Sequence, residues 1–466
     1  MSNPLAPEWL DEPADLNALD DRVWPSNFVR QPTGECSIGG VSVRDLAANF
    51  STPLFVIDED DFRERATAVK EALERAAESI GTTAKVYYAS KAFLSVEIAS
   101  WIDELELNLD VSSGGELAAA LASGIPPQRI GLHGNNKSTR EIARAIAAGV
   151  GAIVIDSEIE IERIAAAAAA QDKIQPVRLR VNTGVHANTH DFLATAREDQ
   201  KFGISIADAP SLVAKIRSHR HLTFLGLHSH IGSQIHSRDG FIEAVRRLVK
   251  LHAELSTVEE VTELNLGGGF GVNYRPSDEA LSIHEFAEAL ATAVKTECER
   301  NSIAVPRLAF EPGRVIAANP GITIYTVGTI KDVNVSEAGA VRKYVSVDGG
   351  MSDNMRPALY EAEYHAVLAS RSSRASAALS RVVGKHCESG DIVVRHDYLP
   401  GDISPSDLLA VAATGAYCYS LSNNYNFLTR PAVVAVRNSE ARLIIRGETE
   451  ADLFTRDLRY QAMKKE

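Results

Sequence analysis

The sequence predicts an α/β protein made of a (β/α)8 barrel and a second, mostly antiparallel β domain. Strand-like and helix-like segments alternate through the middle of the 466-residue chain. Eight such pairs fit into roughly 250 residues, which is the usual size of this barrel. Near residue 320 the alternation ends and short runs of β-branched residues follow. An open, doubly wound sheet remains the alternative, because strand order cannot be read from one sequence.

Short apolar runs are the candidate barrel strands. The segments between most of them carry apolar residues at helical spacing, as in "FIEAVRRLVKLHAELS" and "IHEFAEALATAVKTECERN". Alternation of this kind predicts parallel strands joined by helical crossovers. In chain order the predicted strands cover residues 85–90, 105–113, 129–135, 151–157, 176–182, 224–232, 262–269 and 307–313.

The last third of the chain has a different pattern. "ITIYTVGTIKDV", "DIVVRHDYLP" and "PAVVAVRN" are typical of strands separated by turns, as in a β-sandwich or a β-barrel. The strand "PLFVID" (53–58) precedes the first barrel helix and is predicted to join this β domain. We therefore predict three parts: an N-terminal extension and strand at 1–58, the barrel at 59–320 and the β domain at 321–466.

Composition and charge favour a soluble protein of the cytoplasm. The formal net charge is −14, which argues against nucleic acid as the main partner. No apolar run is long enough to span a bilayer, and the acidic N-terminus lacks the pattern of a signal peptide. The four cysteines are scattered without a CxxC pair, which indicates reduced thiols.

Polar residues or glycines end nearly every predicted barrel strand. Barrel enzymes build their sites from the carboxyl ends of the strands, where successive strand ends meet on one rim. The sequence therefore predicts a single site on that rim. In chain order the residues are Lys91, Ser113, His133 with Asn135, Ser157, Arg180 with Asn182, His230, Gly267 to Gly269, and Glu311 with Arg314.

Lys91 is the first candidate for chemistry. A lysine at a strand end can simply extend its amine into solvent. At an apolar barrel mouth, however, desolvation disfavours the ammonium form, and a neutral amine can form a Schiff base. The carbonyl partner is either a substrate or pyridoxal 5′-phosphate (PLP).

The glycine run "GGGFG" after the seventh strand favours PLP. Consecutive glycines let backbone N–H groups close around an anion, and phosphate sites near strands seven and eight recur in barrels. Ser233 and Arg314 can add a hydroxyl and a positive charge to the same phosphate. The run is not a GxGxxG motif, because position 272 is valine.

Two further strand ends bear on the same cofactor. Glu311 in "FEPGR" can keep a pyridine nitrogen protonated, although a surface glutamate before a turn is a common alternative. His228 and His230 in "HSHIGSQ" are predicted to point to one side of a strand, so a metal site is also possible. We favour His230 stacked on the ring, with His228 as its structural neighbour and no metal.

With these residues in view, the chain resembles the fold-type III, alanine-racemase-like PLP-dependent decarboxylases. Within them it is most similar to the diaminopimelate decarboxylases, from about residue 51 to residue 436. The marks that carry the resemblance are "YYASKAF", "DVSSGGEL", "HGNNKS", "RVNTGVHANTH", "EDQKFGI", "HSHIGSQ", "LNLGGGFG", "EPGR", "DGGMSDNMRPALY", "CESGD" and "GAYCYSLSNNYN".

The resemblance implies a role for each candidate residue. Lys91 holds PLP as a Schiff base, and Cys387 donates the proton to the product. Cys387 and Glu388 are expected to enter the site from the other subunit of a homodimer. The implied catalytic residues are Lys91, Cys387, Glu311 and His230. The implied cofactor-binding residues are Lys91, His230, Ser233, Gly268, Gly269, Glu311, Pro312, Gly313, Arg314 and Tyr417, and the implied substrate-binding residues are Arg314, Arg356, Tyr360, Glu388 and Tyr417.

The expected reaction is decarboxylation of meso-2,6-diaminopimelate to L-lysine and CO2. This substrate keeps one amino-acid end intact, and recognition of that end needs a cation and an anion; Arg356 and Glu388 have those signs. An ornithine or arginine decarboxylase of the same fold is the alternative, but it gives Arg356 no task. A racemase of this fold, a metal-dependent barrel hydrolase and a PLP-binding protein without activity are more remote.

Overall fold

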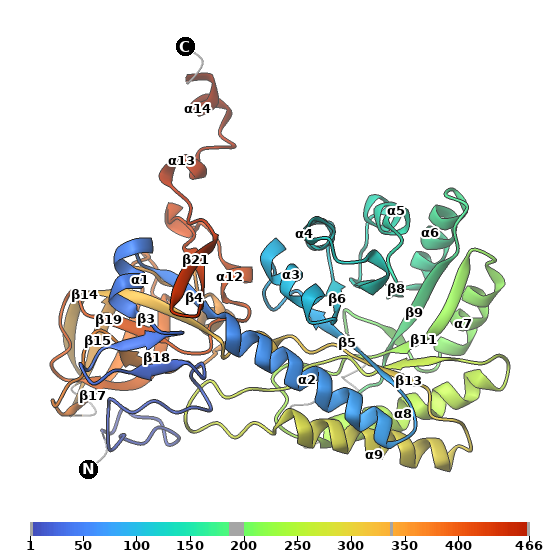
Figure 1. Ribbon diagram of the computed structural model, residues 1–466, viewed down its shortest axis with the longest axis horizontal. Helices are drawn as coiled ribbons and strands as arrows, with labels where there is room; N and C mark the ends of the chain where they lie inside the picture. The colour runs from blue at the N-terminus through green and yellow to red at the C-terminus, as the bar shows by residue number, and fades with distance from the viewer. Residues whose placement is uncertain (1–2, 186–199, 336–338, 464–466) are drawn as a thin grey trace. The chain divides into compact units, whose positions relative to one another are not determined.

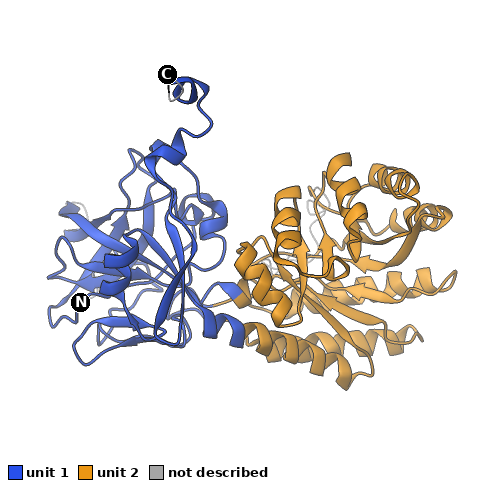
Figure 2. Cartoon of the chain, turned by 45° about the horizontal axis from the view of Figure 1, so that its top comes forward, with its two compact units in different colours: residues 1–64, 273–279, 317–466 blue, residues 65–272, 280–316 orange. Residues whose placement is uncertain are grey.

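The computed structural model describes residues 3–185, 200–335 and 339–463. The marks "RVNTGVHANTH" and "EDQKFGI" therefore lie partly outside the described residues. The chain forms two compact units, shown in Figure 2. One unit, the barrel unit, comprises residues 65–272 and 280–316, and the other, the β unit, comprises residues 1–64, 273–279 and 317–466.

Eight parallel strands close into a barrel. The sheet runs in the order β5, β6, β7, β8, β9, β11, β12 and β13, and it closes because β13 also pairs with β5. This closure confirms the barrel and excludes the open, doubly wound sheet. The strands are β5 (Ala84–Ala89), β6 (Asn108–Val111), β7 (Ile130–Leu132), β8 (Ala152–Ile155), β9 (Gln175–Asn182), β11 (Leu222–His228), β12 (Glu263–Asn265) and β13 (Arg307–Phe310), with the short β10 (Ile204–Ser205) beside β9.

Helices follow the barrel strands (Figure 1). Their ends match local sequence signals: Ser138 and Ser282 each form a capping box, and Gly149 ends its helix in the left-handed conformation. None of the described helices is both long and apolar enough to cross a membrane. The helices are α2 (Glu59–Ser79), α3 (Val96–Glu104), α4 (Gly114–Ser123), the 3-10 turn η1 (Pro127–Arg129), α5 (Thr139–Ala148), α6 (Glu158–Ala169), α7 (Ala209–Ser218), α8 (Asp239–Ser256), α9 (Ile283–Arg300) and α10 (Arg314–Ala317).

The β unit contains a mixed, mostly antiparallel sheet in the order β18, β17, β15, β14, β4, β20 and β21, with β19 joining β14 to β16. The predicted N-terminal strand is part of it: β4 pairs with β14 and β20. The strands are β4 (Leu54–Asp58), β14 (Gly321–Val335), β15 (Ala340–Val347), β16 (Ala366–Leu368), β17 (Ala377–Val383), β18 (Ile392–Pro400), β19 (Leu408–Val411), β20 (Ala432–Arg437) and β21 (Glu440–Ile445).

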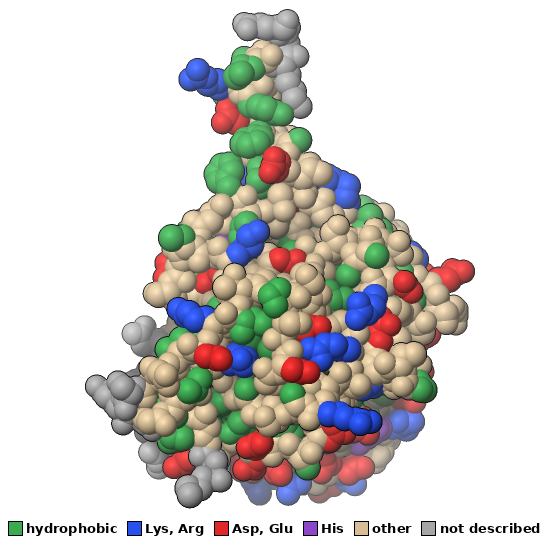
Figure 3. Space-filling model, turned by 90° about the vertical axis from the view of Figure 1, so that its left-hand side faces the viewer, with side chains coloured by type: hydrophobic (Ala, Val, Ile, Leu, Met, Phe, Trp, Pro, Cys, Tyr) green, Lys and Arg blue, Asp and Glu red, His purple; other side chains and the backbone are tan. Residues whose placement is uncertain are grey.

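Short elements complete the β unit. The C-terminal helix α14 carries the exposed apolar side chains Leu458 and Met463. One face of the molecule shows acidic and basic side chains interspersed (Figure 3). These elements are β1 (Phe28–Arg30), β2 (Cys36–Ile38), β3 (Val41–Ser42), α1 (Val43–Phe50), α11 (Arg356–Tyr360), α12 (Cys418–Leu421), η3 (Tyr425–Phe427), α13 (Glu450–Leu453) and α14 (Leu458–Met463).

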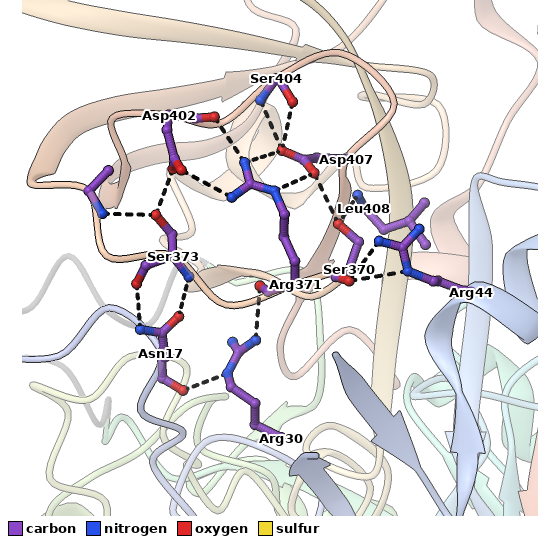
Figure 4. Close-up of polar contacts among 11 residues, drawn as sticks. Asn17, Arg30, Arg44, Ser370, Arg371, Ser373, Asp402, Ser404, Asp407 and Leu408 are labelled. Atoms are coloured by element: carbon purple, nitrogen blue, oxygen red, sulfur yellow. Dashed lines mark hydrogen bonds and ion pairs between the residues drawn. The ribbon is translucent and has the colours of Figure 1, made fainter. Parts of the chain in front are cut away.

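The N-terminal extension is hydrogen-bonded to the segment between β16 and β17 of the β unit (Figure 4). Asn17 exchanges two hydrogen bonds of 2.9 Å with the backbone of Ser373. The guanidinium of Arg30 donates to the backbone oxygens of Asn17 and Arg371, and Arg44 donates to that of Ser370. Because these side chains satisfy backbone groups, the extension is an integral layer of the β unit.

Candidate active site

The carboxyl ends of the barrel strands surround a cavity of about 330 Å³. Several of the residues predicted for the rim therefore line one cavity. Lys91 follows β5, and its side chain is exposed at the cavity. The other lining residues that the argument uses are Asp110, His133, Arg180, His228, His230 and Glu311.

Glu311 is the buried hub of the cavity. Its Oε1 accepts a hydrogen bond of 2.7 Å from the side-chain amide of Asn265, and its Oε2 lies 3.0 Å from Nε2 of His228. Nε2 of His133 lies 3.4 Å from Oε1. Burial opposes ionisation, but the interactions with His228 and His133 outweigh it and hold the pKa of Glu311 well below its ordinary value. The carboxylate is therefore ionised.

The imidazoles around Glu311 are neutral. Burial lowers the pKa of His228, and it lowers the pKa of His133 well below the ordinary value. A neutral imidazole donates through one ring nitrogen, so Nε2 of His228 carries the proton that faces Glu311. No lysine or arginine forms an ion pair with Glu311 among the residues that the structure describes.

His228 and His230 both line the cavity, but only His228 belongs to a strand. β11 ends at His228, four residues before the end of the predicted strand. His230 lies beyond it, and its Nδ1 accepts a hydrogen bond of 3.3 Å from the backbone N–H of Gly268. The segment after β11 thus lies beside the glycine run, and the two-residue alternation of a strand no longer applies to it. Burial lowers the pKa of His230 well below its ordinary value, so this ring too is neutral.

A possible metal-ligand group differs from the HxH pair. His133, His228 and Glu311 each offer a ligand atom, and these atoms lie within 4.8 Å of one another. Nε2 of His228 is at hydrogen-bonding distance from Glu311, whereas Nε2 of His133 has no hydrogen-bond partner among the described residues. The His228–Glu311 geometry alone serves either a cation or a protonated ring nitrogen.

Asp110 is a cavity residue that sequence reasoning missed. It is the last residue but one of β6, and one of its oxygens lies 3.4 Å from Nε2 of His133. Burial, reinforced by the negative charge of Glu311, raises the pKa of Asp110 well above its ordinary value. Its position in the mark "DVSS", at a strand end, is the signal that could have identified it.

The proposed phosphate residues lie together on the rim. Nη2 of Arg314, at the start of α10, donates a hydrogen bond of 2.8 Å to Oγ of Ser233. The glycine run follows β12 in close backbone packing: a Cβ atom on Gly268 would lie 1.9 Å from the carbonyl oxygen of Glu311, and one on Gly269 would lie 2.3 Å from that of Gly232. Gly269 also has φ of +111°, so both positions require glycine.

Comparison with known proteins decides the chemistry. Residues 64–318 match the family described as "Pyridoxal-dependent decarboxylase, pyridoxal binding domain". The chain belongs to this decarboxylase family. Its cofactor is therefore PLP.

Individual relatives of this family cover nearly the whole chain. Diaminopimelate decarboxylase of Mycobacterium leprae is 50% identical over 461 residues, which cover 97% of this chain and 96% of that protein. The enzyme of Bacillus subtilis is 43% identical, with 92% and 96% covered. The crystal structure of diaminopimelate decarboxylase from M. jannaschii with L-lysine has a TM-score of 0.86 and 31% identity, with 93% and 98% covered.

The rim fits the cofactor of this decarboxylase family. Glu311 is an ionised, buried carboxylate with neutral neighbours, as a protonated pyridine nitrogen requires. The hydroxyl of Ser233 and the guanidinium of Arg314 suit a phosphate, and Lys91 lines the same cavity as Glu311. Gly313 keeps this segment close to β5, since a Cβ there would lie 3.0 Å from Cβ of Ala89.

The other predicted residues of the decarboxylase site lie in the β unit, on three segments. Arg356 and Tyr360 belong to α11, where Arg356 is buried and Tyr360 is 65% exposed. Cys387 and Glu388 are exposed between β17 and β18, and the backbone N–H of Cys387 donates to Oδ1 of Asn426 at 3.1 Å. Tyr417 precedes α12 with φ of +66°, a backbone conformation that is unfavourable for a bulky residue.

Proposed function

We propose that this protein catalyses the PLP-dependent decarboxylation of meso-2,6-diaminopimelate to L-lysine and CO2. Relatives that carry this activity in their names are 50% identical over nearly the whole chain. The observation that carries the choice of substrate is Arg356, which is 6% exposed and has no carboxylate partner among the described residues. A buried guanidinium without an acidic partner is a site for a carboxylate that the ligand brings.

The barrel rim holds the cofactor in this proposal. Bound PLP supplies an electron sink for the carbon that loses CO2. Lys91 binds the cofactor covalently, and Glu311 keeps a proton at the pyridine nitrogen. His230 lies against the ring. Ser233, Gly268, Gly269, Pro312, Gly313 and Arg314 surround the phosphate and the ring, and Tyr417 contacts both cofactor and substrate.

The substrate is held at its distal end by groups of opposite charge. Arg356 and Arg314 bind the carboxylate that is retained, and Tyr360 adds a hydroxyl. Glu388 binds the distal ammonium. An ornithine or arginine decarboxylase binds a substrate without that carboxylate, so Arg356 supports diaminopimelate over those alternatives.

Proton delivery is assigned to Cys387. After CO2 leaves, its thiol gives a proton to the α-carbon, and the thiolate is then reprotonated from solvent. The exposure of Cys387, Glu388 and Tyr360 supports a homodimer in which Cys387 and Glu388 enter the site of the other subunit.

The cellular setting and the domain boundaries are part of the same proposal. We place the protein in the cytoplasm, because its four cysteines, all within the described residues, form no disulfide. We also keep the division into residues 1–58, 59–320 and 321–466 as the units to be tested by truncation.

The decisive experiment measures CO2 release and the amine product from four separate substrates: meso-diaminopimelate, L-lysine, L-ornithine and L-arginine. We expect L-lysine as the product of the first and little turnover of the other three. Preferred turnover of ornithine or arginine would overturn the substrate assignment. Retained absorbance of covalently bound cofactor in Lys91→Ala would overturn the role of Lys91.

A further inference from the structure

Arg356 lies between two tyrosine rings of the β unit. Its guanidinium carbon is 4.8 Å from the ring centroid of Tyr274 and 5.5 Å from that of Tyr364. Its Nη1 also donates a hydrogen bond to the hydroxyl of Tyr364. These contacts satisfy a buried cation partly without an anion, since ring faces attract a cation through their quadrupole.

A closed series of hydrogen bonds ties this guanidinium to its own backbone. Oη of Tyr364 lies 3.4 Å from Sγ of Cys418, and that sulfur lies 3.5 Å from Oδ1 of Asn354. Oδ1 of Asn354 also accepts from the backbone N–H of Arg356 at 3.4 Å. Burial raises the pKa of Tyr364 well above its ordinary value, so the phenol keeps a proton to give to the sulfur.

The second ring is fixed by its own segment. Tyr274 meets Tyr364 edge to face, with centroids 5.2 Å apart. The backbone N–H of Tyr274 donates to Oδ2 of Asp278 at 2.9 Å. The side-chain amide of Asn319 donates to the backbone oxygens of Asn273 and Val23, each at 3.0 Å, and thereby ties this segment to the N-terminal extension.

We propose that Tyr274, Tyr364, Cys418 and Asn354, here called the Arg356 frame, position Arg356 to bind the distal carboxylate of the substrate. This inference rests on the proposed function of Arg356. A carboxylate partner within the protein would neutralise the guanidinium and compete with the substrate. Two rings and one phenol oxygen hold it in place and leave most of its five N–H donors for the ligand.

The frame makes a prediction about ligands that differ only in the distal carboxylate. L-lysine keeps that carboxylate, whereas 1,5-diaminopentane lacks it. Tyr364→Phe removes the hydroxyl that orients the guanidinium. We expect this variant, loaded with PLP, to bind L-lysine about tenfold more weakly and to bind 1,5-diaminopentane as the parent does. The KM for meso-diaminopimelate is expected to rise about as much, with kcat within about threefold.

A ring-specific pair of variants tests Tyr274. We expect Tyr274→Leu to weaken L-lysine binding by about ten- to thirtyfold, the range of a buried cation–π contact. Tyr274→Phe keeps the ring and should restore most of this loss. A loss of equal size in both variants would show that the hydroxyl, or the fold of the segment, matters rather than the ring.

Tyr344→Phe is the matched control. Tyr344 has the same relation to an arginine elsewhere in the β unit: its ring centroid is 5.7 Å from the guanidinium of Arg381, and its hydroxyl accepts from that arginine at 3.4 Å. It belongs to no predicted site, so its loss should leave the binding of both ligands unchanged. A change as large as that of Tyr364→Phe would overturn the frame proposal.

Arg356→Met separates the two levels of the argument. If Arg356→Met leaves the affinity for L-lysine unchanged, the proposed function of Arg356 fails. If Arg356→Met weakens L-lysine but Tyr364→Phe weakens neither ligand, or both equally, the proposed function stands and the frame is overturned. Should Tyr364→Phe fail to fold, Cys418→Ala breaks the same series of hydrogen bonds and is expected to weaken L-lysine selectively by about threefold.

Discussion

Two buried glutamates in one barrel have opposite surroundings. Glu263 opens β12 and is fully buried, with an ion pair to Arg178, one of 3.1 Å to Arg307 and one of 3.6 Å to Lys85. Glu311 follows the next strand and lies among neutral imidazoles and the amide of Asn265. The two glutamates belong to two layers of side chains inside the barrel. β12 contributes to both layers, because Glu263 and Asn265 are two residues apart and share one face of the strand.

The difference distinguishes a structural charge from a functional one. A buried carboxylate whose charge the protein itself balances is complete, as at Glu263, where burial is outweighed by three cations and the pKa is lowered. At Glu311 the carboxylate is ionised, but no lysine or arginine among the described residues balances its charge. A ligand that brings a positive ring nitrogen completes that layer. The partners of a buried charge, more than its burial, therefore indicate its role.

The largest expected effect is a loss of stability when the balanced carboxylate of Glu263 is removed. Glu263→Gln leaves Arg178, Arg307 and Lys85 without their anion, so we expect a loss of about 3–5 kcal/mol in the free energy of unfolding. The folded fraction should retain kcat within about threefold, because Glu263 does not line the cavity. Denaturant unfolding with activity assays on the folded protein checks both. Full stability would show that this layer is not a structural charge cluster.

Glu311→Gln is expected to have the converse effect. The amide cannot hold a proton at the pyridine nitrogen, so kcat should fall by about 10²–10³-fold, the usual loss when one preorganised electrostatic partner is removed. Stability without cofactor should change by less than about 1 kcal/mol, since Glu311 has no permanent cation to lose. The same two assays apply, and a variant that is unstable yet active would reverse the assignment of the two layers.

The sequence predicts the rim better than the layer below it. Lys91, His230 and Glu311 follow apolar runs, and the carboxyl ends of parallel strands must meet, so their convergence follows from the barrel alone. The pairing of Arg178 with Glu263 joins residues 85 positions apart, and no local period reveals it. His228 and His230 both line the cavity, but β11 ends at His228, so strand alternation does not extend to His230.

The β unit was harder to predict, for a related reason. Its strand β4 could be placed because an isolated apolar strand must pair with other strands of a sheet. The Arg356 frame could not, since Tyr274, Tyr364 and Cys418 come from three separate segments with no shared spacing. Glycine and charge marks such as "CESGD" locate loops, but the contacts that orient a guanidinium depend on tertiary packing.

His252 extends the comparison to a buried group that has no balancing charge within the described part of the chain. It lies on α8 and is 3% exposed, and burial alone lowers its pKa to about 4. The folded pKa lies below the unfolded value of about 6.5, so the stabilising contribution is complete above pH 6.5 and is lost as the pH falls towards 4. Between pH 7.5 and 4.5 we expect the parent to lose about 2–3 kcal/mol more than His252→Asn in denaturant unfolding. If the free energy of unfolding changed equally with pH in the parent and in His252→Asn, the burial of His252 without a balancing charge would be contradicted.

Lys85→Met gives the smallest expected change and the finest test of charge balance. The side chain of Lys85 is 39% exposed, so solvent screens its 3.6 Å ion pair with Glu263. Arg178 and Arg307 still balance the carboxylate, and methionine keeps the apolar stem of the lysine. We therefore expect a loss of only about 0.5–1 kcal/mol in the free energy of unfolding, lessened by salt. A loss approaching that of Glu263→Gln would mean that the layer needs all three cations, so that balance at Glu263 is a property of the whole cluster rather than of its two arginines.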